Sequence, residues 1–160
     1  MKPRHASRAV AAGVALALVA CGQSGTPDIR SGDEPRASAP VAGSSQILLD
    51  LHNAGDGDDV LLEASTPAAL GVEFHLTSID GGRASMDQLD EVEIPAGDTV
   101  HFRPGGLHLM MVVPDETVVG GGDLDLTLTF EHSEPMTVEV EVVDLLDLAE
   151  ASFDETEAAS

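Results

Sequence analysis

Two stretches near the C-terminal end of the chain alternate strictly between apolar and polar residues. In "LDLTLTF", residues 124–130, Leu and Phe alternate with Asp and Thr, and in "MTVEVEVV", residues 136–143, Val alternates with Thr or Glu. Successive side chains of a β-strand point to opposite faces. The alternation therefore predicts strands that have one face in a core and the other face in solvent.

Five shorter apolar stretches are further strand candidates, and residues typical of turns separate them. The candidates are "QILLDLH", "GVEFHLT", "EVEIP", "TVHF" and "LHLMMVV", and the turn signals are "NAGDGDD", "DGG", "PAGD", "RPGG" and "GGGD". Turn signals that recur roughly every 8 to 12 residues are typical of antiparallel sandwiches and barrels. No long helical pattern occurs among them, so the sequence predicts an all-β fold, an antiparallel β-sandwich or barrel.

The first twenty residues have the pattern of a secretory signal peptide. Lys2, Arg4 and Arg8 precede the apolar run "AVAAGVALALVA", which is shorter than the roughly 20 residues that a membrane-spanning helix needs. The run ends in "LVAC", which resembles the lipobox of bacterial lipoproteins, where the cysteine is acylated. We expect residues 1–20 to be removed and Cys21 to anchor an extracytoplasmic protein, in the periplasm or at the cell surface. A retained membrane span or an unmodified thiol is the alternative.

Composition divides the rest of the chain into three parts. Residues 21–44 are rich in Gly, Ser, Pro and charge, which predicts a flexible linker. Residues 45–146 contain the strand candidates and are expected to form one domain. Residues 147–160 are acidic and contain few apolar residues, which predicts a disordered tail.

Charge and composition exclude several classes of function. The formal net charge of −22 would repel a phosphate backbone, and a chain with four Phe and no Trp or Tyr offers few stacking surfaces for bases. We therefore expect no nucleic-acid partner. The sequence shows no Ser-His-Asp arrangement in a recognisable elbow, no phosphate loop and no zinc-protease helix motif. It predicts a protein that is not an enzyme.

Two strand candidates hold histidines on identifiable faces. In "GVEFHLT" the alternation places His75 with the polar side chains, so we expect it to be accessible. In "LHLMMVV", His108 and Met110 share a face because residues i and i+2 project together. Imidazole beside a soft thioether favours Cu(I) over hard cations. A blue-copper electron-transfer site is excluded, because it needs a cysteine thiolate and the chain has no cysteine after Cys21.

The spacing of two histidines and two methionines, H-x10-M-x21-H-x-M, resembles the signature of the PCu(A)C family of periplasmic copper chaperones. Similar segments surround it: "NAGDGDDVLLEASTPAALGVEFH", "VEIPAGDTVHFRPGGLHLMM" and "LDLTLTFE". The resemblance covers most of residues 45–143. Many members have Met directly after the first histidine, where this chain has Leu76, and this chain lacks the His- and Met-rich C-terminal extension of some members.

The resemblance implies a cupredoxin-like, Greek-key β-sandwich that binds one Cu(I) ion through His75, Met86, His108 and Met110. Met86 lies in "GGRASMDQ", which the sequence predicts to be a loop. The family passes copper towards the copper-site subunit of cytochrome c oxidase, towards Sco-type proteins or towards other acceptors outside the cytoplasm.

Two other functions stay open at this point. The chain could be an acidic surface lipoprotein with a structural or adhesive role, or it could store and buffer copper without delivering it. The three remaining histidines are expected to be ordinary strand or surface residues. They are His52, His101 and His132.

Overall fold

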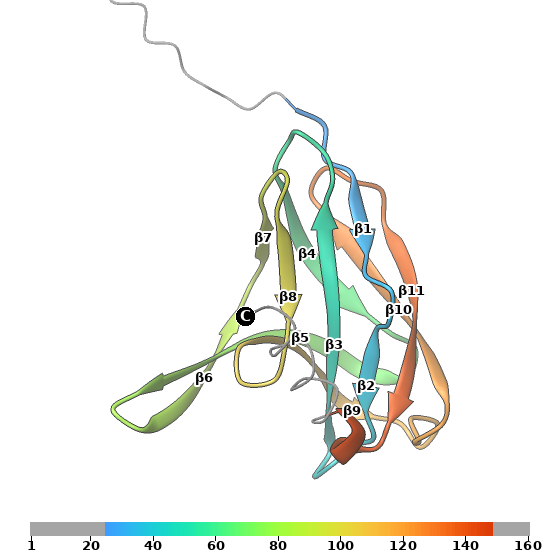
Figure 1. Cartoon of the computed structure of the whole chain (residues 1–160). Coiled ribbons are helices and arrows are strands. Elements are labelled where there is room, and N and C mark those ends of the chain that lie inside the picture. The colour runs from blue at the N-terminus through green and yellow to red at the C-terminus, as the bar shows by residue number, and fades with distance from the viewer. Residues whose placement is uncertain (1–24, 149–160) are drawn as a thin grey trace, which may run out of the picture.

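The computed structural model describes residues 25–148, and its regular structure is almost entirely β-strand. The strands are β1 (Ile29–Ser31), β2 (Arg36–Ser38), β3 (Ser44–Asn53), β4 (Asp59–Ser65), β5 (Ala69–Asp80), β6 (Arg83–Leu89), β7 (Val92–Ile94), β8 (Thr99–Phe102), β9 (Leu107–Pro114), β10 (Asp123–Phe130) and β11 (Met136–Val143). One short helical turn at 145–148 follows β11. The predicted all-β fold is confirmed (Figure 1).

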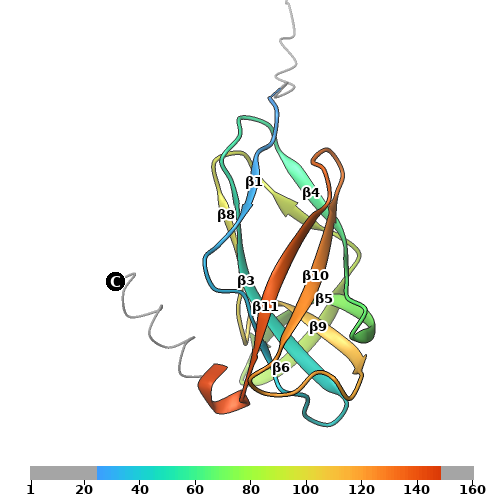
Figure 2. The same cartoon turned by 90° about the vertical axis from the view of Figure 1, so that its right-hand side faces the viewer.

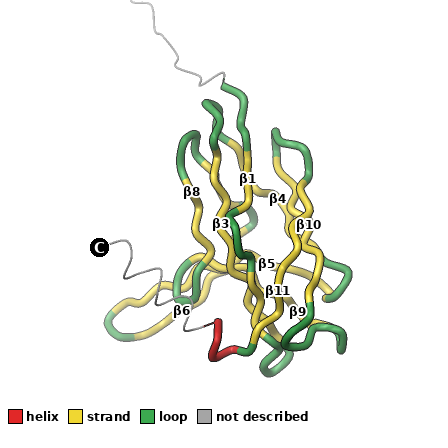
Figure 3. The backbone as a smooth tube through the Cα atoms, turned by 45° about the vertical axis from the view of Figure 1, so that its right-hand side comes forward, coloured by secondary structure: helices red, strands yellow, loops and turns green. Residues whose placement is uncertain are grey.

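The strand order is β6-β5-β9-β3-β2-β11-β10-β4-β7, and β1 and β8 pair with β3 beside this path. Every pairing is antiparallel except that of β2 with β11. β3 is shared: its first half pairs with β9 and β2, and its second half with β8 and β1. Figures 2 and 3 show β1, β3 and β8 on one side of the sandwich and β4, β10 and β11 on the other.

The core lies between these layers, as the alternating stretches predict. Leu126 and Leu128 of β10 and Val140 of β11 are fully buried, whereas Asp125 and Glu139 on the opposite faces are exposed. Each buried Leu or Val contributes about 1.5–3 kcal/mol relative to exposure. The core thus consists mainly of Leu, Ile and Val side chains, together with the buried phenylalanines Phe74, Phe102 and Phe130.

The predicted linker, residues 21–44, needs correction over its described part. β1 pairs with β3, and β2 pairs with both β3 and β11, so the folded domain begins before residue 45. These strands are three residues each, too short to show a periodic pattern, and β2 buries small side chains, Ala37 and Ser38. The predicted signal peptide, Cys21 and residues 149–160 of the predicted tail lie outside the described residues. Residues 147 and 148, which the sequence assigns to that tail, lie in the helical turn, where Leu148 is buried. Within residues 25–148, no helix is long and apolar enough to cross a membrane.

Asn53 ties the start of the described chain to the core. Its side chain is fully buried and uses its whole hydrogen-bonding capacity. The Asn53 Oδ1 accepts from the amides of Asp28 and Gly55, and its Nδ2 donates to the carbonyls of Gly57 and Ile94. The Asn53 side chain therefore connects the segment before β1 to the turn after β3 and to the end of β7. These hydrogen bonds hold β1 against the rest of the domain.

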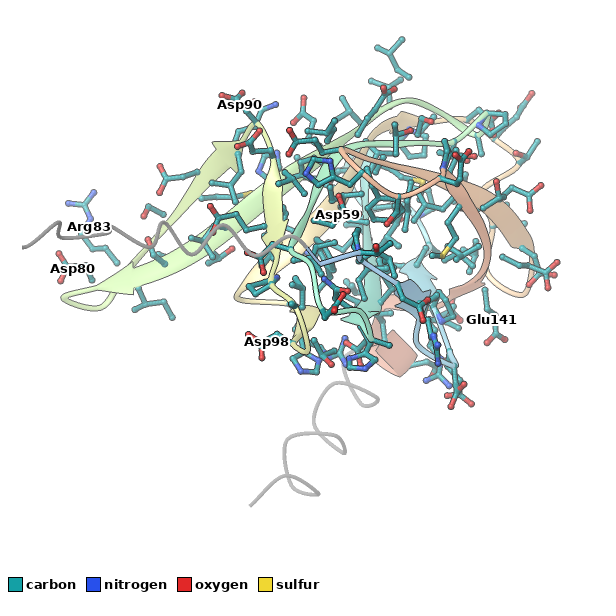
Figure 4. All side chains as sticks on the ribbon, turned by 90° about the horizontal axis from the view of Figure 1, so that it is seen from above. Asp59, Asp80, Arg83, Asp90, Asp98 and Glu141 are labelled. Atoms are coloured by element: carbon teal, nitrogen blue, oxygen red, sulfur yellow. The ribbon has the colours of Figure 1, made fainter. Side chains whose placement is uncertain are left out.

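Asp59, at the start of β4, holds the turn between β10 and β11 in the same way (Figure 4). Its Oδ1 accepts from the amides of Val60 (2.8 Å) and His132 (3.0 Å), and its Oδ2 accepts from the amide of Ser133 (3.0 Å). Burial raises the pKa of Asp59, but the hydrogen bonds from Ser133, Val60 and His132 outweigh it and lower the pKa below its usual value.

The lowered pKa of Asp59 predicts an acid-sensitive contribution to stability. Because the folded pKa is depressed, the contribution is present above the unfolded value, about 3.9, and is lost as pH falls through the folded pKa. We expect Asp59→Asn to lower the free energy of unfolding by about 1–3 kcal/mol at pH 7, since the new amide cannot accept from Ser133. Urea unfolding at pH 7 and pH 3 measures the free energy of unfolding of both proteins, and the difference between wild type and Asp59→Asn should be smaller at pH 3.

Glu63→Gln, on the exposed face of β4, is the control. An equal loss of stability in Glu63→Gln and Asp59→Asn would contradict the role given to Asp59.

Candidate metal centre

The antiparallel pairing of β5 with β9 places two histidines directly opposite each other. His75 in β5 is the register partner of His108 in β9. Directly opposed residues of an antiparallel pair project from the same face of the sheet. The two imidazole rings accordingly lie with their centroids 5.8 Å apart and their planes tilted by 38°.

Both rings are buried. His75 is 9% exposed and His108 is 1% exposed. The expectation that His75 is accessible is therefore wrong. Alternation identifies the face from which a side chain projects, but not what covers that face. Here β5 is flanked on one side by β9 and on the other by β6, whose Gln88 is the register partner of His75.

In each ring, one nitrogen makes a hydrogen bond and the other nitrogen makes none. The Nε2 of His75 lies 2.8 Å from Oε2 of Glu73, and the Nδ1 of His108 lies 2.9 Å from the carbonyl oxygen of Gly106. A carbonyl and an ionised carboxylate only accept, so these partners assign the proton to Nε2 of His75 and to Nδ1 of His108.

The remaining ring nitrogens are the unusual feature of this part of the molecule. The Nδ1 of His75 and the Nε2 of His108 are buried and have no hydrogen-bond partner within the described chain. In the assigned tautomers each bears a free lone pair. Burying an acceptor without a donor costs about 1–3 kcal/mol, so two such atoms on adjacent strands require an explanation.

Two methionines lie on the same face as the histidines. Met110 follows His108 by two residues and is opposite Glu73 of β5 and Gln46 of β3. Met86 is opposite Thr77, which follows His75 by two residues on β5. The four side chains predicted as ligands therefore project from one face of the three neighbouring strands β6, β5 and β9.

Met86 lies in strand β6, and the prediction of a loop is wrong. β5 and β6 form a hairpin whose turn contains Gly81 (φ 55°) and Gly82 (φ 81°), a left-handed conformation that glycine adopts readily. β6 is an edge strand, exposed along nearly its whole length, so it needs no apolar alternation and gives no periodic signal. Met86 itself is 50% exposed.

The chemistry of this face is that of nitrogen and sulfur donors. Among residues 25–148, no group of three or more His, Cys, Asp or Glu side chains is placed to hold a metal ion. Besides Glu73, whose carboxylate contacts His75, the side chains near the histidine pair on this sheet face include the thioethers of Met86 and Met110. Imidazole combined with thioether favours a soft cation such as Cu(I) over Mg²⁺ or Ca²⁺.

The other histidines have different surroundings. His52 on β3 contacts the hydroxyl of Thr99 through Nδ1 (3.0 Å), and His101 on β8 contacts Asp50 through Nδ1 (2.8 Å). Both are exposed, as is His132 after β10. No contact described in the structure joins any of the three to the buried pair.

Comparison with known proteins places the chain among putative lipoproteins. The family model described as "Putative lipoprotein LpqE-like" matches residues 28–142. Putative lipoprotein Lxx21020 of Leifsonia xyli subsp. xyli is 30% identical over 107 residues, 66% of this chain and 64% of that protein. Uncharacterized protein RP573 of Rickettsia prowazekii is 27% identical over 100 residues, 62% of this chain and 55% of that protein. The chain spans less than two thirds of either relative.

Solved structures of PCuAC domains have a similar fold. The copper-bound PCuAC domain from PmoF2 matches with a TM-score of 0.61 at 24% identity, covering 72% of this chain and 92% of that domain. Cu(I)-DR1885 from Deinococcus radiodurans matches with a TM-score of 0.59 at 24% identity, covering 72% of this chain and 78% of that protein. These matches confirm the cupredoxin-like β-sandwich that the sequence resemblance implied.

The hydrogen bonds of the two rings predict their tautomers in solution. At about pH 8, where a free imidazole is neutral, we expect long-range ¹H–¹⁵N spectra to show the Nε2–H form of His75 and the Nδ1–H form of His108. In Glu73→Ala, His75 should sample both forms and His108 should be unchanged. Glu91→Ala is a control carboxylate outside this contact. The same His75 spectrum in Glu73→Ala and in the wild type would contradict the role given to Glu73.

Proposed function

This chain belongs to the LpqE-like family, and we propose that it is an extracytoplasmic copper carrier that binds one Cu(I) ion. The proposed ligands are Nδ1 of His75, Nε2 of His108 and the sulfur atoms of Met86 and Met110. Copper is the cargo of this protein rather than a catalytic cofactor, so the proposed activity is non-catalytic.

The pair of unpartnered ring nitrogens is the observation that supports this proposal most strongly. Histidines that bind metals usually donate their other N–H to a carboxylate or a backbone carbonyl, which fixes the tautomer and the ring orientation. Both arrangements are found here, Glu73 for His75 and the Gly106 carbonyl for His108. A cation between the two rings would use both lone pairs and remove the cost of burying them.

The ligand set also suits a protein that gives its metal away. Neutral imidazole and thioether ligands hold Cu(I) without a thiolate. A cysteine ligand could be lost to a disulfide in an oxidising compartment, whereas a thioether cannot form one. The two histidines are buried, but half of the Met86 side chain is in solvent. An acceptor could therefore displace the Met86 sulfur first, while the histidines still hold the ion.

The proposed location follows from the lipobox-like sequence "LVAC" and from the lipoprotein relatives. Acylated Cys21 would hold the domain at the outer face of a membrane. From there copper would pass to the copper-site subunit of cytochrome c oxidase, to a Sco-type protein or to another copper acceptor.

An anaerobic titration with Cu(I) against a chromophoric chelator tests the proposal. We expect residues 22–160 to bind one equivalent, and Met86→Leu and Met110→Leu each to weaken binding at least about tenfold, or about 1.4 kcal/mol. Leucine replaces methionine at similar volume and removes only the sulfur. Met136→Leu, at the start of β11, is the matched control and should bind like the wild type.

The titration also separates the other functions. No competition with the chelator would favour a structural or adhesive lipoprotein and contradict the proposal. Binding that is unchanged in both methionine variants would contradict the ligand set. Tight binding without transfer to any copper acceptor would favour storage, which would use the same four residues.

A further inference from the structure

The hairpin formed by β5 and β6 extends beyond the rest of the sheet. β9 pairs with β5 from Ala69 as far as Leu76, and the amide of Thr77 still donates to the carbonyl of Gly106. The β5 residues after Thr77 pair only with β6. Among the described strands, β6 has no second neighbour. Figure 1 shows the hairpin projecting from the body of the sandwich. We call its projecting part, residues 77–86, the arm.

One face of the arm continues the face that holds the proposed copper ligands. Thr77 is opposite Met86, and Ile79 is opposite Ala84. Since Thr77 and Ile79 follow His75 at intervals of two, all of these side chains project from the same side as the histidine rings. The arm therefore extends the ligand face outward, with Met86 at the inner end and Ile79 towards the tip.

Apart from Thr77, the side chains on this face of the arm are apolar, and Ile79, Ala84 and Met86 are open to solvent. Ile79 is 73% exposed and Met86 is 50% exposed, and they are diagonal neighbours across the hairpin. A single exposed aliphatic residue needs no explanation. Here a β-branched side chain, a methionine and Ala84 are adjacent on a two-stranded projection, where they bury little surface. Apolar surface rimmed by polar residues is typical of an interaction site.

The charge around this face indicates what kind of partner it fits. Asp80 and Arg83 are register partners at the tip and project from the opposite face of the arm (Figure 4). On the ligand face the charge is acidic, because Glu73 projects there beside His75, and Asp90 and Glu91 follow β6 at the base of the arm. The whole chain has a net charge of −22. A second copy of this chain would be repelled, whereas a partner with basic residues around an apolar patch would be attracted and steered.

We propose that the arm is the docking surface for a basic copper-accepting protein, an inference that rests on the proposed copper-carrier function. Transfer requires a nitrogen or sulfur lone pair of the acceptor to bind the ion as the bond to the Met86 sulfur breaks. The ion stays Cu(I), and no electron or proton is transferred. Contact of the acceptor with Ile79 and Ala84 places its ligands beside Met86, at the exposed side of the site.

The test measures transfer and binding in the same variants. Copper-loaded protein is mixed anaerobically with the copper-free soluble domain of the oxidase copper-site subunit and, separately, of a Sco-type protein from the same organism. We expect Ile79→Thr to reduce the second-order transfer rate roughly five- to tenfold, because exposed apolar anchors dominate binding at interfaces. Its Cu(I) affinity should equal that of the wild type. Threonine keeps the β-branched shape that suits a strand.

Leu70→Thr is the matched control, because Leu70 is a similarly exposed aliphatic residue of the same strand. It lies nine residues before Ile79, near the opposite end of β5, which corresponds to about 30 Å along an extended strand. It should transfer copper at the wild-type rate. Raising the salt concentration from 0.05 to 0.5 M should slow transfer in all three proteins, as expected for a basic partner.

Each other result has a distinct meaning. Wild-type transfer by Ile79→Thr would overturn docking at the arm while leaving copper binding intact. Absence of transfer from the wild type to either acceptor would overturn both delivery and docking. Loss of Cu(I) binding in the wild type would refute the carrier function itself. Dimerisation that Ile79→Thr abolishes would assign the arm to a second copy and overturn the proposal.

Discussion

The geometry of the candidate site depends on three consecutive strand registers. β3 aligns β9 by pairing Ile47 with Leu109, both fully buried. β9 aligns β5 by pairing His108 with His75, and β5 in turn aligns β6 and thereby Met86. A slip of one residue in any of these pairings would send side chains to the opposite face. The core residues of β3 and β9 therefore determine which side chains lie together on the face that holds the proposed copper ligands. They project from the opposite face and are not themselves among those ligands.

The buried imidazole pair is a place where the protein gives up stability. The buried side chains of Asn53 and Asp59 each make several hydrogen bonds. The free nitrogens of His75 and His108 have no such partner among the described residues, at a cost of about 1–3 kcal/mol each, and they are the two unpartnered acceptors that lie on paired strands. Such exceptions are typical of functional sites, since a site that binds a cation must present lone pairs before the cation arrives. In the proposed centre, the buried histidines would form the closed side and the half-exposed Met86 the open side.

The sequence predicts the long strands because their apolar residues alternate, and the spacing of His75, Met86, His108 and Met110 resembles a known signature. The structure confirms the fold and places these four residues on one face. Three features have no signal in the sequence. β1 and β2 are too short to be periodic, and β6 is an exposed edge strand. His75 is buried, although alternation groups it with polar residues, and its neighbours include His108 of β9, which is distant in sequence. The partners Glu73 and Gly106 precede their histidines by only two residues, but ordinary strand residues have the same spacing.

X-ray absorption spectroscopy of the protein loaded anaerobically with one equivalent of Cu(I) tests most directly whether the imidazole pair and both thioethers form one centre. We expect a first coordination shell with two nitrogen and two sulfur scatterers, and multiple-scattering features of imidazole. The coordination shell of Met110→Leu should contain one sulfur fewer and the same two nitrogens. This result would distinguish the specific site from copper that is bound nonspecifically. A shell of nitrogen and oxygen only, or one that is identical in the wild type and Met110→Leu, would contradict the four-ligand centre.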